Sequence, residues 1–180
     1  MMHEGEFVRQ LRQVTPSVHD LVSRGLSAEL ASEVIRGYSI HPKSRIVASG
    51  MQDPLVRLIE NYDLSNFHLA DVTFPKEVEC GRWGCVVGHY AGDDLVRRAS
   101  DGSVFLMELG TTGHALYECA ESGDKFLDAL LRSAQFFGRS LASDQLEARR
   151  MVRECTALAG GERYARFYNS LIGCSSLELN

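Results

Sequence analysis

The feature that most constrains the fold is the stretch Trp83–Cys119, in which short apolar runs alternate with turn sequences. Asp101-Gly102 separates two of these runs, and an Asp-Gly pair in that setting is a strong hairpin signal because the tight turn needs positive φ. The runs lie at 83–89, 95–99, 104–109 and 114–119. Because short loops join antiparallel neighbours, the stretch predicts an antiparallel β-meander.

Helical periodicity marks the chain on both sides of this stretch. Ser27, Asp53 and Ser122 each stand directly before an apolar helical stripe, where N-caps are found. Helices are expected at 4–15, 18–24, 28–36, 54–62, 122–138, 143–158 and 162–173. Alternation predicts a fifth sheet strand over Phe67–Phe74, and a short strand is expected at 45–48. This element order predicts an α+β fold with about five antiparallel strands between N- and C-terminal helices.

Two strands of the meander carry patterns that bear on their surroundings. Residues 104–107 are apolar at every position, which predicts a central strand covered on both faces or at least flanked by helices. Arg97 and Arg98 place one positive charge on each face of their strand, which is typical of an edge or half-exposed strand. Both patterns predict how far helices cover the faces of these two strands.

Length and composition suit one domain over residues 1–180, since 44% of residues are hydrophobic and no linker or charge run divides the chain. The first residues carry charge without an apolar segment, and the uncharged run 83–92 is far shorter than a membrane span. We therefore expect a cytoplasmic protein with no membrane partner. The net charge of −5 argues against phosphate-driven nucleic-acid binding and suits a basic protein partner.

The order of strands and turns resembles the SMI1/KNR4 superfamily, also called SUKH. Members show a small apolar strand with glycine, a second strand, an Asp-Gly-like turn, a third strand and an amphipathic helix. The residues that carry the resemblance are Trp83-Gly84, Gly88, 94–99, Asp101-Gly102, 104–109, Ser122, Phe126 and Leu127. It covers roughly residues 67–137 and leaves 143–173 as a C-terminal helical extension.

The resemblance implies an α+β fold and, among bacterial members, an immunity protein that neutralises a polymorphic toxin, often a nuclease. Eukaryotic members resemble regulatory interaction proteins. On this basis we expect a non-enzymatic protein-binding domain whose partner is a cognate toxin. Two alternatives remain: a regulatory or scaffold module of the same fold, and a small enzyme or metal-binding protein.

Aromatic residues and loop acids of the meander are the candidate partner contacts. Tryptophan, tyrosine and arginine dominate binding hot spots, which favours Trp83 and Tyr90 beside Arg82. The alternative for Trp83 is a core residue packed beneath a helix. Acids would complement a basic toxin and speed association. The full candidate set is Glu77, Glu79, Trp83, Tyr90, Asp93, Asp94 and Glu121.

Residues of the types that bind zinc occur in the same region, at Cys80, Cys85, His89, His114 and Cys119. In regular strands Cys85 and His89 would share one face while His114 and Cys119 would oppose each other, and no Cys-x-x-Cys pair exists. We therefore expect no metal site, and reduced thiols with Cys85, Cys119 and Cys155 in the core. No nucleophile elbow, zinc-protease motif or phosphate loop is present, so no catalytic residue and no cofactor are expected.

Overall fold

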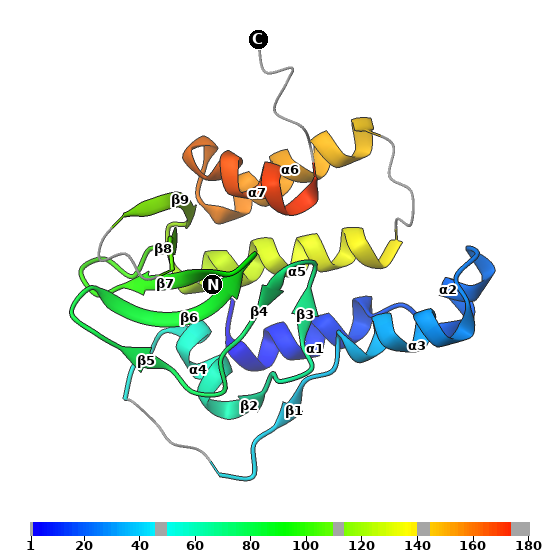
Figure 1. Ribbon diagram of the computed structural model, residues 1–180, viewed down its shortest axis with the longest axis horizontal. Coiled ribbons are helices and arrows are strands. Elements are labelled where there is room, and N and C mark those ends of the chain that lie inside the picture. The colour runs from blue at the N-terminus through cyan, green and yellow to red at the C-terminus, as the bar shows by residue number, and fades with distance from the viewer. Residues whose placement is uncertain (1, 46–49, 110–113, 140–144, 174–180) are drawn as a thin grey trace.

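The computed structural model describes residues 2–45, 50–109, 114–139 and 145–173, and it has the expected α+β architecture (Figure 1). The first helices are α1 (Glu4–Val14), α2 (Val18–Ser23), α3 (Ala28–Arg36) and α4 (Pro54–Asn61). After the sheet come α5 (Gly123–Arg139), α6 (Gln145–Ala159), the 3-10 helix η1 (Glu162–Tyr164) and α7 (Ala165–Ile172). Within these described ranges no helix combines the length and the apolar composition needed to cross a membrane.

The strands form one large antiparallel sheet and one small one. The large sheet has the order β3-β4-β6-β7-β8-β9, with β5 also paired to β6. Its strands are β3 (His68–Leu69), β4 (Val72–Thr73), β5 (Glu79–Cys80), β6 (Gly84–Tyr90), β7 (Asp93–Arg98), β8 (Val104–Met107) and β9 (Ala115–Ala120). The small sheet pairs β1 (His41–Pro42) with β2 (Tyr62–Asp63). The predicted meander is thus confirmed as β6 to β9.

The turn between β7 and β8 forms as its sequence predicts. Gly102 has a φ of 76°, and the Asp101 carboxylate accepts a hydrogen bond from the Ser103 N–H at 3.0 Å. The Arg98 N–H closes the loop by donating to the Ser103 carbonyl at 2.8 Å. The short polar loop therefore sets the register of the two central strands.

The single strand expected over Phe67–Phe74 is wrong, because the chain reverses within it to form the β3–β4 hairpin. Ala70 has a φ of 49°, and Leu69 pairs directly with Val72. In one continuous strand these two apolar side chains would point to opposite faces, whereas the hairpin buries both on the same face. The short strand expected at 45–48 falls largely on residues 46–49, outside the described residues.

One hydrophobic cluster joins the sheet to the helices on one side of it. Helices α4, α5 and α7 contact the sheet, and α1 and α6 pack against those helices. Phe167 of α7 lies near its centre with no exposed surface, and its ring centroid is 5.3 Å from that of Tyr90 and 6.2 Å from that of Phe126. The C-terminal helices therefore share a core with the meander.

A partly buried ion pair ties α4 to the sheet. Asp53 is the N-cap of α4, as predicted, and its carboxylate accepts from the N–H groups of Leu55 and Val56. The other carboxylate oxygen lies 2.6 Å from Nε of Arg97. Strand β7 is central, so the edge alternative is wrong, whereas the half-exposed alternative agrees with its partly exposed residues. The inward Arg97 is tolerated because Asp53 neutralises it.

Candidate functional site

The sheet has an open face opposite the hydrophobic cluster. Strand pairing aligns its outward side chains in two rows across the sheet. The first row is Glu79, Val86, Val96, Phe105 and Glu118, and the second is His89, Asp94, Met107 and Ala115. The first row is apolar at its centre and acidic at both ends. Phe105 is absent from the core cluster that contains its neighbours Val104 and Leu106, as expected for a residue on the other face.

A hollow of about 640 Å³ lies on this open face, and we call it the arginine–aromatic depression. It is lined by Arg82, Trp83, Val96, Arg98, Ala99, Ser100, Phe105, Met107 and Ala115. All of these residues come from strands and turns. Of the two alternatives for residues 104–107, β8 is therefore a central strand in a sheet flanked by helices on one face, and not a strand covered on both faces. Trp83 is 55% exposed, which rules out the alternative of a core tryptophan beneath a helix.

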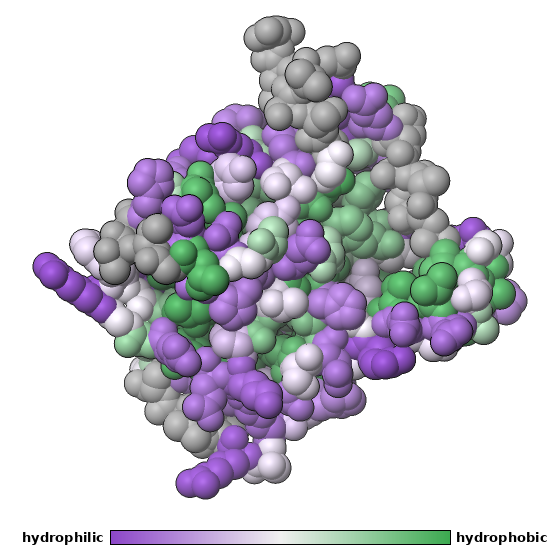
Figure 2. All heavy atoms as spheres, viewed as in Figure 1, coloured by the Kyte–Doolittle hydropathy of each residue, from purple (hydrophilic) through white to green (hydrophobic). Residues whose placement is uncertain are grey.

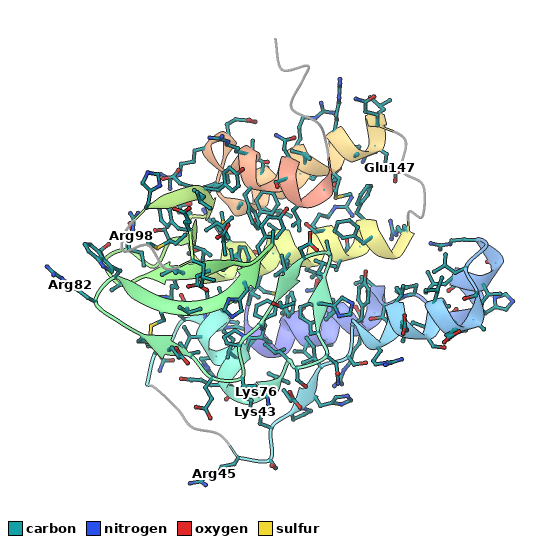
Figure 3. The ribbon with its side chains drawn as sticks, viewed as in Figure 1. Lys43, Arg45, Lys76, Arg82, Arg98 and Glu147 are labelled. Carbon is teal, nitrogen blue, oxygen red and sulfur yellow. A yellow bond between two sulfur atoms is a disulfide. The ribbon has the colours of Figure 1, made fainter. Side chains whose placement is uncertain are left out.

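Two arginines stack on the aromatic rings of the depression. The guanidinium carbon of Arg82 lies 5.4 Å from the centroid of Trp83, and that of Arg98 lies 3.9 Å from the centroid of Phe105. Stacking of Arg98 explains why Phe105 is only 7% exposed although, among the described residues, no helix residue lines the depression. Figure 3 shows Arg82 and Arg98 at the same end of the sheet. A stacked guanidinium keeps its N–H donors at its edge, available to an acceptor.

The turn that presents Trp83 is closed by a disulfide. Strand β5 places Cys80 directly opposite Cys85, with 4.0 Å between their Cα atoms, and the two form a disulfide bond. The expected reduced state of Cys85 is therefore wrong, because the two-residue β5 gave no periodic signal in the sequence. Gly84 fits beneath the turn because a Cβ there would collide with the carbonyl of Arg97.

We expect reduction of Cys80–Cys85 to lower the free energy of unfolding by about 2 kcal/mol, the value for a loop this short in the chain-entropy account. Urea unfolding with and without TCEP measures the change, and fluorescence anisotropy of Trp83 reports the freed turn. The variant Cys80→Ala/Cys85→Ala is the control, since its unfolding should not respond to TCEP. An unshifted unfolding curve for the reduced wild type contradicts this expectation.

The candidate zinc ligands do not gather. Cys80 and Cys85 are bonded to each other, and a β-bulge in the middle of β6 turns Cys85 and His89 to opposite faces rather than the same face. Burial raises the pKa of the Cys119 thiol, and it raises that of Cys155 to about 11. Both thiols are thereby held protonated at neutral pH. Among the described residues no group of three or more His, Cys, Asp or Glu side chains could hold a metal ion.

Three of the predicted contacts lie on or beside the open face, namely Glu79, Trp83 and Asp94. Asp94 faces His89 across the strand pair, with 3.0 Å between carboxylate Oδ1 and Nδ1. Tyr90, by contrast, is 6% exposed and hydrogen-bonds through its hydroxyl to Ser170 Oγ at 2.9 Å. Tyr90 therefore belongs to the core and not to the open face.

The remaining predicted acids are dispersed. The carboxylate of Asp93 accepts a hydrogen bond from the Leu109 N–H at 3.1 Å, so it braces the end of β8. Glu121 is exposed after β9, where a hydrogen bond from Lys125 lowers its pKa. Glu77 lines a separate hollow of about 750 Å³. These acids do not form one continuous patch with the depression.

Half of the residues that line the hollow beside Glu77 are charged, and one of them already donates hydrogen bonds to backbone carbonyls. Lys43 donates from Nζ to the carbonyls of Ile59 and Lys76, at 2.6 and 2.7 Å. Figure 3 shows Lys43 and Lys76 close together, below the sheet. Anchor pockets are usually apolar with a few convergent polar groups. The arginine–aromatic depression meets that description better.

A third surface is the arm formed by α2 and α3, which projects from the body of the molecule (Figure 1). Figure 2 shows hydrophobic atoms gathered over this arm, and Val18, Val22 and Leu30 are its large exposed apolar residues. The neighbouring hollow of about 450 Å³ is lined chiefly by polar and charged residues. No arginine stacks on an aromatic ring among the described residues of the arm, whereas two do so at the depression.

The sequence interpretation missed Arg98, Phe105 and Met107 as site residues. Alternation along β7 and β8 was the available signal, since it places these side chains on one face with Val96. That signal identifies a shared face without saying which face is left open. The open face emerges only when α4, α5 and α7 are seen to pack on the other.

The fold and the site together define an α+β protein with an exposed arginine- and tryptophan-bearing sheet face. Searches of family models, of curated proteins and of solved structures find no match to this chain. The resemblance to the SMI1/KNR4 superfamily therefore stays a prediction, and functional inference rests on the geometry of the site.

Proposed function

We propose that this chain is a non-catalytic, cytoplasmic protein-binding domain that neutralises a cognate toxin through its open sheet face. The observation that carries the binding role is Trp83, 55% exposed in a depression whose rim holds two stacked arginines. Exposed tryptophan and arginine around an apolar floor are the composition of a binding hot spot. The immunity role is added by the resemblance of residues 67–137 to SMI1/KNR4 proteins.

The charge of the chain supports a basic partner at long range. A net charge of −5 raises the association rate with a positively charged toxin, such as a nuclease, because opposite fields steer encounters. Glu79, Asp94 and Glu118 on the open face lie where such a partner would arrive. Binding over this face would cover the toxin or hold it inactive.

A toxicity rescue tests the proposed function. The reading frame next to this gene is expressed in a sensitive host, alone and together with this protein, and survivors are counted. The proposal expects killing by the neighbour alone and growth on co-expression. If the neighbour is harmless, or kills in both cases, the immunity role is refuted. A pull-down that then returns an endogenous partner would favour a regulatory or scaffold module of the same fold.

Trp83→Ala is expected to weaken partner binding by about 2 kcal/mol, roughly thirtyfold in Kd, because it removes the anchor from the depression. Thermal stability should change little, since most of the Trp83 surface is already solvated. Calorimetric titration of the co-purified partner measures the loss. The matched control is Leu30→Ala, an exposed apolar residue on α3, which should leave Kd unchanged. Equal affinity of wild type and Trp83→Ala would exclude the depression as the interface.

A further inference from the structure

We propose that the arginine–aromatic depression binds an acidic, apolar segment of the partner protein. One apolar side chain of that segment packs on Phe105 and Met107, and neighbouring carboxylates meet Arg82 and Arg98. The inference rests on the proposed function and specifies the chemistry of the segment that the open face recognises.

The charges at the rim of the depression point to a carboxylate. Arg82 stacks on Trp83, and among the described residues no carboxylate lies within ion-pair distance of its guanidinium. Arg98 has one acidic neighbour, Asp101 at 3.5 Å, in a solvent-exposed pair of the kind that contributes little. Both guanidinium groups therefore have N–H donors to offer, and arginine pairs best with carboxylate in a bidentate geometry.

The floor of the depression points to an apolar side chain. Val96, Phe105, Met107 and Ala115 form it, and its volume of about 640 Å³ lies within the usual range of ligand pockets. Met107 adds an adaptable surface, because its unbranched side chain can rearrange around an incoming group. A segment in which an apolar residue is flanked by acidic residues can therefore pack on the floor and pair with the arginines of the rim at the same time.

A polypeptide fits this face better than a single-stranded nucleic acid. Stacked aromatic and arginine side chains on a sheet are also used to bind bases. On this face, however, Glu79 and Asp94 lie along the same two rows of side chains, Glu118 lies 3.9 Å from Arg163, and Arg82 and Arg98 lie together at one end of the sheet. A phosphate backbone crossing the sheet would meet these acids, whereas a short acidic segment seated at the arginine end would not.

The local preference for acid is compatible with a partner that is basic as a whole. The net charge of −5 acts at the distances of diffusional encounter, where individual side chains are not resolved. Contacts at the depression form afterwards, and their charged part depends on Arg82 and Arg98. The two charge effects therefore govern different steps, the association rate and the lifetime of the complex.

Peptide display on the full chain tests the inference. A library of linear peptides is selected on immobilised wild type and, separately, on Arg82→Glu/Arg98→Glu. Wild type should enrich peptides that place Asp or Glu beside Leu, Phe or Met, and the charge-reversed variant should not. Trp83 is the only tryptophan in the chain and lines the depression, so its fluorescence reports binding of each synthetic peptide at this site.

We expect the best acidic peptide to bind Arg82→Glu/Arg98→Glu at least about tenfold more weakly than wild type, since charge-assisted hydrogen bonds are lost. Arg36→Glu/Arg153→Glu is the matched control, because it makes the same charge change at exposed positions on α3 and α6. Arg82→Gln/Arg98→Gln, checked by circular dichroism, provides a variant of similar size. Its affinity should fall between those of the wild type and the charge-reversed variant.

Three results overturn the inference: enrichment of basic or neutral peptides, equal binding by the charge-reversed variant, or a dT12 oligonucleotide that quenches Trp83 at lower concentration than any peptide. Failure of the proposed function is seen separately. If Arg82→Glu/Arg98→Glu still rescues growth, the immunity role stands and the acidic-segment inference falls. If acidic peptides bind but no rescue occurs, the inference stands and the immunity role falls.

Discussion

Replacing Asp53 with alanine is expected to lower the free energy of unfolding by about 4 kcal/mol. The carboxylate caps α4 through the N–H groups of Leu55 and Val56, and it neutralises the inward Arg97 at 2.6 Å. Its removal leaves a mostly buried guanidinium without a counter-charge, which accounts for most of the loss, and the lost cap accounts for about 1 kcal/mol. Urea unfolding monitored by circular dichroism measures the change, with an unchanged m-value expected for a two-state transition.

Adjacent arginines on β7 provide a matched control for this prediction. Arg97→Ala should destabilise the protein by about 3 kcal/mol, since it leaves the buried Asp53 carboxylate unpaired. Arg98→Ala removes a side chain of the same type from the open face, and it should lower the free energy of unfolding by about 1 kcal/mol or less. The double variant Asp53→Ala/Arg97→Ala should lose less unfolding free energy than the two single variants lose in total. Each single variant leaves one charge without its partner, and the double variant leaves none. Strictly additive losses would contradict a coupled ion pair.

The same strand thus carries a stabilising ion pair on one face and lines the arginine–aromatic depression on the other. Arg97 points into the core and pairs with Asp53, while Arg98 points outward over Phe105. Because consecutive residues alternate, a single β7 register fixes both side chains at once. We infer that the Asp53–Arg97 pair also helps to hold the rim of the depression in place.

The parts of the fold that sequence predicts well are those specified by local signals. Asp101-Gly102 predicts its turn because only a few residues set the backbone conformation there, and Asp53-Pro54 predicts the start of α4 for the same reason. The reversal at Ala70 has no such signal, since a non-glycine residue adopts positive φ inside an alternating run. Alternation alone could not separate one strand from two.

The site is harder to predict because it depends on long-range packing. Trp83 and Arg82 could be proposed from residue type, but their partner Phe105 lies in a run that is apolar on both faces. Which face stays open depends on how α4, α5 and α7 pack, and α4 and α7 are separated from the meander by long stretches of sequence. Cys80 shows the same limit, since β5 has two residues and exists only through pairing with β6. Such short elements carry no periodicity to read.

Phe167→Ala is expected to cost about 4 kcal/mol of folding free energy. The ring is fully buried in α7 and contacts aromatic rings from three elements: Tyr90 of β6, Phe126 of α5 and Tyr168 of its own helix. Deleting it removes apolar burial and leaves a cavity between the sheet and two helices, which a rigid core cannot fully close. Urea unfolding followed both by Trp83 fluorescence, which reports the sheet, and by circular dichroism, which reports the helices, measures the loss.

The two probes decide whether the helices beyond residue 143 are an appendage or part of the cooperative fold. If they unfold cooperatively with the meander, Phe167→Ala shifts both transitions together, because loosening α7 also uncovers Tyr90 in the sheet. Leu158→Ala, a partly exposed residue of α6, is the control and should shift neither by more than about 1 kcal/mol. A helical transition that moves alone, with the Trp83 signal unchanged, would mean that the meander folds without the C-terminal helices. The depression could then be studied on a shorter chain, whereas coincident transitions require the C-terminal helices in every binding experiment on the open face.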